Sequence, residues 1–515
     1  MEVKLPIFAT KVSFLSSIKK LASQTFWYGF SNIFGRFLNY LLTPLLTSIF
    51  ASEKYGDISV LFAAAAFLNI VYTYGMETSY FRFNNLYSEK DVYNTGLTTL
   101  LITSIFFTVI LMIPIQSFAT YMQIGSHPEY IKWVLLIVSL DTLAVLPFSK
   151  LRHEGRPRKF AFIKIINILI NVGLVIFFLY WCKGEHQRGA ENIWSIIYDP
   201  EIDIGYVFIA NLVASLVTLF MLGSELSSFK FRWDGKLFRE MLIYSSPLII
   251  VGFGGVINET IDRFMITAYY PGSPLEARSA NGIYSANNKL AVLIVLFIQA
   301  FRMGAEPFFF KEAAGENAPR TYARVMKFFV IVCCVCFLGV MLFLDVWKYF
   351  MGIRNHPEYL EGLKVVPWLM LGKIFLGIYY NLAIWYKLTN KNLMGAYITI
   401  GGAILTISLN YLLIPYIGYL GCAIASLVCY GTMMAVSYKM GQKYYPVPYA
   451  YKKLIAYVSI AMILFGVHQF IKLLVNEMIY VHLSGFLLLA GYILFISIIE
   501  KKELKSLPVI GKFYS

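Results

Sequence analysis

Charge is scarce in this chain. Asp, Glu, Lys and Arg make up 14% of its 515 residues, whereas 58% of the residues are hydrophobic. A soluble chain of this length would be expected to form several domains, each with a charged surface. The composition therefore argues against a soluble protein and indicates one that lies in a membrane.

Cysteine is also scarce, and its spacing points to no site. Five of the six cysteines lie inside apolar runs, and the sixth, Cys182, lies at the end of one. The pattern shows neither a disulfide framework nor metal-ligand spacing, so we expect all six to fill the core. We expect no metal and no other cofactor.

Motifs for catalysis are absent as well. Gly235-Lys236 and Gly372-Lys373 are each followed by an apolar residue, so neither forms the phosphate-binding loop of an ATPase. The longest loop that we expect outside the membrane, residues 183–203, is too short for a catalytic domain. We expect no ATP hydrolysis and no enzymatic activity.

Long apolar runs are abundant instead. A helix of about 20 apolar residues crosses the hydrocarbon of a bilayer, and by this measure we predict about fourteen crossings. They span approximately residues 21–50, 58–81, 96–119, 130–149, 160–181, 204–223, 241–270, 282–309, 328–348, 363–386, 394–415, 418–438, 454–474 and 482–499. The predicted fold class is an all-α, polytopic integral membrane protein.

The positive charges predict the topology. The net charge is +15, but Lys and Arg gather on alternate connections between spans, which argues against binding to nucleic acid. The basic segments are the N-terminus, 150–159, 230–239, 320–327, 439–453 and the tail 501–512. By the positive-inside rule these segments are cytoplasmic, and both termini lie inside.

Two sequence fingerprints recur along the chain. Gly75-Met-Glu-Thr-Ser-Tyr-Phe-Arg82 returns as Gly304-Ala-Glu-Pro-Phe-Phe-Phe-Lys311, and His127-Pro-Glu-Tyr130 returns as His356-Pro-Glu-Tyr359. Both copies are 229 residues apart, from 75 to 304 and from 127 to 356. We interpret His-Pro-Glu-Tyr as a helix start, because Pro and Glu suit the first helical positions. The chain is an internal duplication.

The duplication predicts the architecture. Each copy holds an even number of crossings, about six, so both copies enter the membrane from the same side and are related by an axis along its normal. We expect two pseudo-symmetric six-helix lobes, in residues 1–223 and 224–440. Residues 441–515 form an appended transmembrane hairpin and a cytoplasmic tail.

Polar side chains inside the first span form a stripe. Tyr28, Asn32, Arg36, Asn39 and Thr43 recur every three or four residues, which places them on one face of a helix. Such a face cannot lie against lipid. Since no carboxylate lies one turn away, we expect Arg36 to line a cavity and meet an anion; the alternative is a buried ion pair with another helix.

Later spans carry further ionisable residues. Glu259 and Arg263 are four residues apart, as are Arg302 and Glu306, and this spacing allows ion pairs along one helix. The two charges of each pair either simply neutralise each other, or the pair is broken when a ligand or a proton binds. By the duplication, Glu77 corresponds to Glu306. Each glutamate is expected near the cytoplasmic end of its helix, where it forms either a gating link to another helix or a contact with the basic residue that follows it.

Four other charges lie within spans. Asp262 adjoins Arg263, and Lys373 lies deep in its span, whereas Lys164 is near enough to the surface to snorkel. Asp141 has no local basic partner, so it is protonated, paired across helices or functional.

The duplication, the first span opening with Thr25-Phe-Trp-Tyr-Gly29, and the Gly-x-Glu-x-x-Tyr-Phe-Arg segment at 75–82 resemble polysaccharide flippases of the multidrug, oligosaccharidyl-lipid and polysaccharide exporter superfamily. The resemblance covers the first twelve predicted helices. It implies a two-lobed, V-shaped transporter that moves an undecaprenyl-diphosphate-linked oligosaccharide across the bacterial inner membrane by alternating access. It also implies a place in O-antigen, capsule, lipopolysaccharide or exopolysaccharide assembly, with membrane lipids and the polysaccharide polymerase machinery as partners.

A diphosphate requires cationic donors, preferably the bidentate fork of Arg. The predicted substrate-binding residues are Arg36, Arg263, Arg302, Lys373, Asn32 and Asn39. The carboxylates predicted to serve ion coupling, to H⁺ or Na⁺, or gating are Glu77, Glu259, Asp262 and Glu306. Thr73 stands where the second copy has Arg302, an asymmetry that we expect of a site for one diphosphate between the two halves.

Three alternative functions follow from the same features. A drug or cation antiporter of this superfamily would have an acidic site, against which the arginines argue. A lipid II flippase differs in the substrate headgroup, which the charge pattern does not resolve. A membrane-embedded polymerase or ligase would need larger outer loops than this chain has.

The substitution Arg36→Ala is expected to abolish surface polysaccharide, because it removes a cation that meets the diphosphate. The variant should remain in the membrane at normal abundance, as measured by immunoblotting beside a surface polysaccharide assay. Unimpaired export would remove Arg36 from the mechanism.

Overall fold

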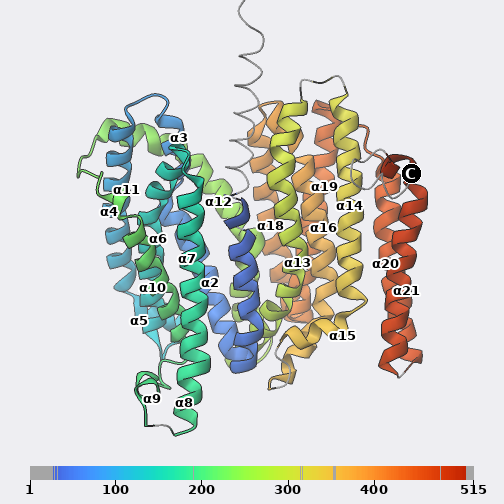
Figure 1. The fold of residues 1–515 in the computed structure, drawn as a ribbon, viewed down its shortest axis with the longest axis horizontal. Coiled ribbons are helices and arrows are strands. Elements are labelled where there is room, and N and C mark those ends of the chain that lie inside the picture. The colour runs from blue at the N-terminus through green and yellow to red at the C-terminus, as the bar shows by residue number, and fades with distance from the viewer. Residues whose placement is uncertain are drawn as a thin grey trace, which may run out of the picture. The chain divides into compact units, whose positions relative to one another are not determined.

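The structure, a computed structural model, describes residues 27, 29–31, 33–189, 191–313, 315, 317–351, 355–475 and 477–505. Within these residues all regular secondary structure is helical, as predicted (Figure 1). The described residues form two compact units. Unit one comprises those of Met1–Leu42 together with Gly56–Thr267, and unit two comprises Thr43–Tyr55 together with those of Ala268–Ser515.

Residues 33–49 are helical and are followed by the helices α2 (Ser52–Thr73), α3 (Met76–Phe83), α4 (Glu89–Met112), α5 (Ile115–Tyr121), α6 (Pro128–His153), α7 (Pro157–Ile176), α8 (Lys183–Gln187), α9 (Ile193–Ile197), α10 (Gly205–Met221), α11 (Gly223–Leu226) and α12 (Gly235–Tyr269). A π-helical turn, Phe177–Cys182, joins α7 to α8.

The remaining helices are α13 (Pro274–Glu312), α14 (Ala318–Met341), α15 (Leu344–Trp347), α16 (Val366–Leu382), α17 (Ile384–Leu388), α18 (Asn392–Ile417), α19 (Tyr419–Tyr444), α20 (Tyr451–Leu474), α21 (Met478–Ile499) and α22 (Lys501–Lys505). Two 3₁₀ segments, η2 (Lys348–Met351) and η3 (Pro357–Val365), lie between α15 and α16.

Twelve helical segments of the described chain are long and apolar enough to cross a membrane. The chain is therefore a multi-pass membrane protein. Two further predicted crossings fall on α10, which is apolar but shorter, and on the helical residues 33–49. The count of about fourteen crossings stays a prediction.

The His-Pro-Glu-Tyr copies begin helices in both units, which confirms the helix-start interpretation. Pro128 opens α6 after His127, and Pro357 opens η3 after His356. Each tyrosine also holds a loop, since the Tyr130 hydroxyl donates to Ile202 O at 3.1 Å and the Tyr359 hydroxyl donates to Phe50 O at 3.0 Å. The second bond explains why the turn after residue 49 belongs to unit two.

Helix α12 packs within unit one, although the duplication assigns it to the second half. The Ser79 hydroxyl donates to Met241 O at 3.0 Å, and Leu237 and Met241 share a buried cluster with Tyr80 and Leu97. Gly75, with φ of 74°, lies so close to Ser245 that a Cβ would come within 2.9 Å of the serine Cβ. By packing, unit one thus extends to Thr267. The repeat boundary at 223/224 stays a prediction.

The C-terminal hairpin α20–α21 is fastened to unit two at both ends. Glu500, at the end of α21, is 2% exposed and lies 2.6 Å from Lys327 Nζ of α14 and 2.8 Å from Lys453 Nζ of α20. At the opposite end Lys472 pairs with Asp345 of α15. Burial alone would raise the pKa of Glu500, but the hydrogen bonds from Lys327, Lys453 and the Tyr457 hydroxyl lower it to about 2.

The substitution Glu500→Ala is expected to destabilise the protein by on the order of 3 kcal/mol, since it removes a buried carboxylate from two lysines. Thermal unfolding of the purified protein in detergent measures the loss. Glu503→Ala is the matched control, because Glu503 also pairs with Lys327 but is 34% exposed. Equal losses in the two variants would contradict the assignment.

The same carboxylate predicts a pH dependence. Its folded-state pKa of about 2 lies below its ordinary value of 4.5. Its contribution to stability is therefore complete above about pH 4.5 and is lost as the pH falls toward 2. In this window the melting temperature of the unsubstituted protein should fall more steeply than that of Glu500→Gln.

Candidate functional site

A charged cluster lies where α13 and α17 meet in unit two. Glu306 forms an ion pair with Lys387 of α17, and its Oε2 lies 3.7 Å from Arg302 Nε one turn back on α13. The pair that the four-residue spacing predicted, Arg302 with Glu306, is present. Arg302, Glu306 and Lys387 keep 48%, 36% and 25% of their side-chain surface exposed, so a ligand can reach them.

A helix cap, a close contact at a glycine and a turn after a helix position the helices that carry these charges. Helix α13 starts with a capping box in which Ser273 and Glu276 each bond the other's backbone N–H. Gly377 brings α16 close to α14, because a Cβ there would lie 2.7 Å from Phe329 Cζ. Helix α17 ends at Leu388, and Asn390 just beyond it adopts a φ of 56°, a conformation that Asn tolerates better than most residues.

The three charges line a small pocket. Its walls are Ile298, Phe301, Arg302, Ala305, Glu306 and Phe309 of α13 with Gly377, Tyr380, Asn381, Ile384 and Lys387 of α16 and α17. The free space is about 20 Å³, enough for about one water molecule. The Arg302 guanidinium lies 4.7 Å from the centre of the Tyr380 ring, which holds it over the pocket wall. Two cations and one carboxylate leave the pocket with an excess of positive charge.

Asn381 provides the amide side chain of this wall. It is 6% exposed, and its Nδ2 donates to Gly377 O at 3.2 Å. Its Oδ1 is buried and accepts no hydrogen bond from any residue that the structure describes. A buried acceptor of this kind requires a donor from water or from a ligand.

Unit one repeats the ion pair but lacks the pocket residues. Glu77 pairs with Arg152 of α6, whose guanidinium lies 4.8 Å from the Phe81 ring centre. The contact joins two helices, as one of the two alternatives for Glu77 and Glu306 predicted. Arg82, the partner in the other alternative, lies over the Tyr244 ring instead.

Arg152 and Lys387 are equivalent cations that sequence reasoning missed. Each stands three residues before a positive-φ residue, Gly155 in unit one and Asn390 in unit two. Their separation exceeds the 229-residue repeat because the helical segment Pro357–Leu388 has 32 residues and its counterpart Pro128–His153 has 26. The shared turn is the signal that could have identified them.

The copies differ around these pairs. Counting from the equivalent anchors, Thr73 stands at the place of Arg302, Val145 at that of Tyr380, and Leu146 at that of Asn381. The Thr73 hydroxyl bonds its own helix, at Asn69 O. Only the copy in unit two combines the additional cation, the aromatic ring and the amide.

The other predicted site residues lie elsewhere. On α12, Arg263 donates to Ser59 Oγ and to the backbone oxygen of Glu259, both at 3.0 Å, and its closest carboxylate is Asp262 at 3.4 Å. The Glu259 carboxylate is exposed and pairs with no described residue. The side-chain pair that we considered for Glu259 and Arg263 is therefore not formed.

The remaining cations and amides are also separate from the pocket. Lys373 of α16 is buried and lies 5.1 Å from the Tyr430 ring centre. Arg36 and Asn39 are exposed on the helical residues 33–49, and Arg36 makes no ion pair within the described part of the chain. Asn32 falls outside the described residues. Asp141 accepts a hydrogen bond from Ser215 at 2.7 Å.

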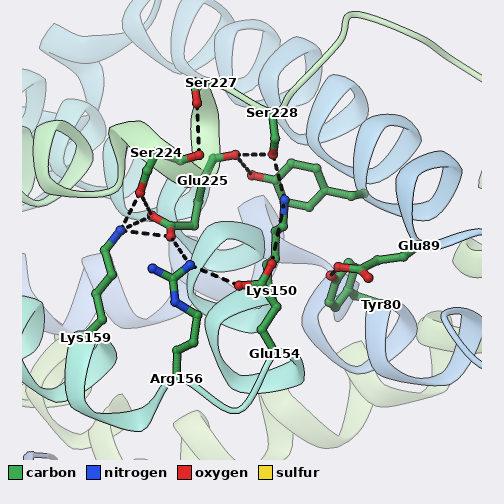
Figure 2. Close-up of polar contacts among 11 residues, drawn as sticks. Tyr80, Glu89, Lys150, Glu154, Arg156, Lys159, Ser224, Glu225, Ser227 and Ser228 are labelled. Atoms are coloured by element: carbon green, nitrogen blue, oxygen red, sulfur yellow. Dashed lines mark hydrogen bonds and ion pairs between the residues drawn. The ribbon is translucent and has the colours of Figure 1, made fainter.

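A second charged cluster in unit one is structural. Figure 2 shows Glu225 of α11 between Lys159 and Arg156, whose nitrogens lie 2.7 and 2.9 Å from its oxygens. Glu225 is 1% exposed; burial opposes its ionisation, but Lys159, Ser224 and Arg156 outweigh this and lower its pKa. The cluster fastens the α6–α7 turn to α11, and Glu225 already occupies its cations.

Residues 21–313 match the family model described as "Polysaccharide biosynthesis protein". No curated protein is a significant match. Among solved structures, the fold is similar to "Lipid II flippase MurJ, inward closed conformation", with a TM-score of 0.71 and 13% identity over 92% of this chain and 99% of that chain.

The fold is also similar to two MATE family transporters of the MOP superfamily. The inward-facing one has a TM-score of 0.63 and 13% identity over 79% of this chain and 93% of that chain. The outward-facing one has a TM-score of 0.54 and 14% identity over 83% and 94%. At these identities the likeness shows a shared fold.

A double-mutant cycle on Glu306 and Lys387 should reveal their coupling. Lys387→Glu is expected to lower stability because it places two carboxylates together, and Glu306→Lys with Lys387→Glu should restore it. We expect a coupling on the order of 1 kcal/mol for so exposed a pair, measured by thermal unfolding. The matched cycle on Glu77 and Arg152 should behave alike. Additive effects in both cycles would show that the pairs are not formed.

Proposed function

The chain belongs to the polysaccharide biosynthesis protein family, as the sequence resemblance predicted, and we propose that it translocates undecaprenyl-diphosphate-linked oligosaccharides across the bacterial inner membrane. In this proposal it acts as a transporter, not an enzyme, and delivers repeat units of O-antigen, capsule or another exopolysaccharide to their polymerase. Transport proceeds by alternating access, and both termini lie in the cytoplasm.

The observation that carries the proposal is the excess of cations over carboxylates in the α13–α17 pocket. Arg302 and Lys387 face a single carboxylate, Glu306, and all three are partly exposed. A diphosphate binds best to partly desolvated guanidinium and ammonium groups. An antiporter of hydrophobic cations would need the opposite balance of charge.

Competition for these cations provides a means of coupling substrate binding to the binding of H⁺ or Na⁺. The substrate phosphate and the Glu306 carboxylate bind the same partners, Arg302 and Lys387, so each weakens the other's hold. Neutralisation of Glu306 by H⁺ or Na⁺ would release both cations to the diphosphate. In unit one Thr73 stands at the place of Arg302, and we assign the pair of Glu77 with Arg152 to gating.

The other predicted residues keep roles in this proposal. Arg36, Asn39 and Asn32 of the first span, with Arg263 and Lys373, contribute to the substrate path. Glu259, exposed on α12, and Asp262, beside Arg263, remain candidates for ion coupling.

An apolar pocket supports the lipid part of the proposal. It has about 400 Å³ of free space and lies in unit two, where α20 faces α14, α16 and α19. Its lining is almost entirely apolar and includes Phe375, Ile378, Met434, Leu454 and Ile455. We assign this pocket to part of the prenyl chain, which must stay in an apolar environment while the headgroup crosses.

Arg302→Ala is expected to weaken binding of the diphosphate by about 10- to 100-fold, since a charge-assisted hydrogen bond contributes about 1.5–3 kcal/mol. The variant is expressed in a strain that lacks the native protein, and the lipid-linked glycan in the inner leaflet is quantified. We expect accumulation of the glycan and loss of surface polysaccharide. Lys311→Ala, at an exposed cation on the same helix outside the pocket, is the control and should transport normally.

The deletion strain separates the alternatives. Absence of any accumulated lipid-linked glycan would contradict the proposal and favour a drug or cation antiporter. Loss of viability would favour lipid II as the substrate. Normal transport by Arg302→Ala would remove the pocket from the mechanism.

A further inference from the structure

We infer that Asn381 recognises the first sugar of the substrate. Its side-chain oxygen accepts a hydrogen bond from the substituent on C2, the ring carbon next to the one that carries the phosphate. This inference rests on the proposed function, because it takes the diphosphate to lie at Arg302 and Lys387. It adds a specificity-determining residue that the charge pattern of the sequence does not indicate.

The argument begins with the orphaned acceptor. Asn381 Oδ1 is buried in the pocket wall and accepts no bond from the described residues, while Nδ2 is held by Gly377 O. The charged donors that line the pocket, Arg302 and Lys387, form ion pairs with Glu306, and neither donates to Asn381 Oδ1. A donor for Asn381 therefore has to come from outside the protein, as water in the empty site and as a ligand group in the occupied one.

The size of the pocket limits that ligand group. The enclosed part of the pocket has only about 20 Å³, which suits a single small donor group, and the rest of the pocket opens to its surroundings. The ring must therefore remain at the mouth and insert one substituent. Since the same small pocket contains the cations that hold the phosphate, the inserted group lies close to the phosphate along the substrate.

The chemistry of a glycosyl diphosphate identifies the group. The anomeric carbon, C1, carries the phosphate oxygen, so the substituent on C2 is the nearest one on the ring. A C2 hydroxyl or a C2 acetamido N–H is a donor that suits a carbonyl oxygen. A ring without a donor at C2 would leave Asn381 Oδ1 desolvated and unpaired, which costs about 1–3 kcal/mol.

The duplication supports a role in recognition over a role in folding. The position equivalent to Asn381 in unit one is Leu146, which is buried in an apolar cluster. The fold therefore accepts an apolar side chain of similar size at this place. A substrate with one reducing-end sugar also requires only one such recognition residue in the chain.

Binding measurements on the purified protein in nanodiscs test the inference. The probes are a short-chain prenyl diphosphate, its N-acetylglucosaminyl conjugate and the corresponding conjugate of a 2-deoxy-2-fluoro sugar, which has no donor at C2. The unsubstituted protein should bind the N-acetylglucosaminyl probe about tenfold more tightly than the fluoro probe. Asn381→Leu should remove this difference and leave the affinity for prenyl diphosphate unchanged.

The outcomes separate the inference from the proposed function. If the unsubstituted protein binds all three probes equally and Arg302→Ala weakens all three, the cationic site stands, Asn381 serves only a bound water, and the inference is overturned. If a preference exists but survives in Asn381→Leu, another residue reads the sugar and the inference is again overturned. If no probe binds, the proposed function itself fails.

The comparison of probes on the unsubstituted protein does not depend on the folding of any variant. Asn381→Leu is used only if its melting temperature matches that of the unsubstituted protein; otherwise Asn381→Thr replaces it, since Thr keeps an acceptor and should retain part of the preference. An undiminished preference in Asn381→Thr would contradict a hydrogen-bonding role, because the shorter Thr hydroxyl cannot occupy the position of Asn381 Oδ1.

Discussion

Carboxylates at the ends of apolar helices need cationic partners, and the packing of both units depends on this need. Glu77 and Glu306 each pair with a basic residue near the end of another helix, Arg152 and Lys387. Glu500 fastens the C-terminal hairpin in the same way. The apolar side chains supply most of the buried area, and the ion pairs add contacts that join particular helices.

The difference between the two copies gives the second one its chemistry. In unit one Thr73 stands at the place of Arg302, and the equivalent of Asn381 is Leu146. In unit two Arg302 adds a cation, Tyr380 holds it and Asn381 presents an acceptor. A duplicated scaffold has thus kept its helix-joining pair in both places and acquired a polar pocket in one. The proposed substrate site depends on that departure from symmetry.

Sequence reasoning found those parts of the site that lie on one helix. Arg302 and Glu306 are one turn apart, and this spacing alone predicted their pair. Lys387 is 81 residues from Glu306, and Arg152 is 75 residues from Glu77, so no periodicity connects them. Local spacing also failed once, since Arg263 turns to Asp262 and to a backbone oxygen instead of the Glu259 carboxylate. A spacing of four residues permits a pair but does not choose among competing partners.

The sequence alone predicted the all-α membrane fold and the duplication. Hydropathy and helix starts depend only on neighbouring residues, and the 229-residue repeat appears when the sequence is compared with itself. The choice of partners between helices did not follow, because it depends on which faces meet once the helices pack. Packing placed α12 with unit one, brought Lys387 to Glu306 and left the Asn381 oxygen buried without a donor. That last feature is invisible in the sequence, since an asparagine in an apolar span looks the same whether its amide is satisfied or not.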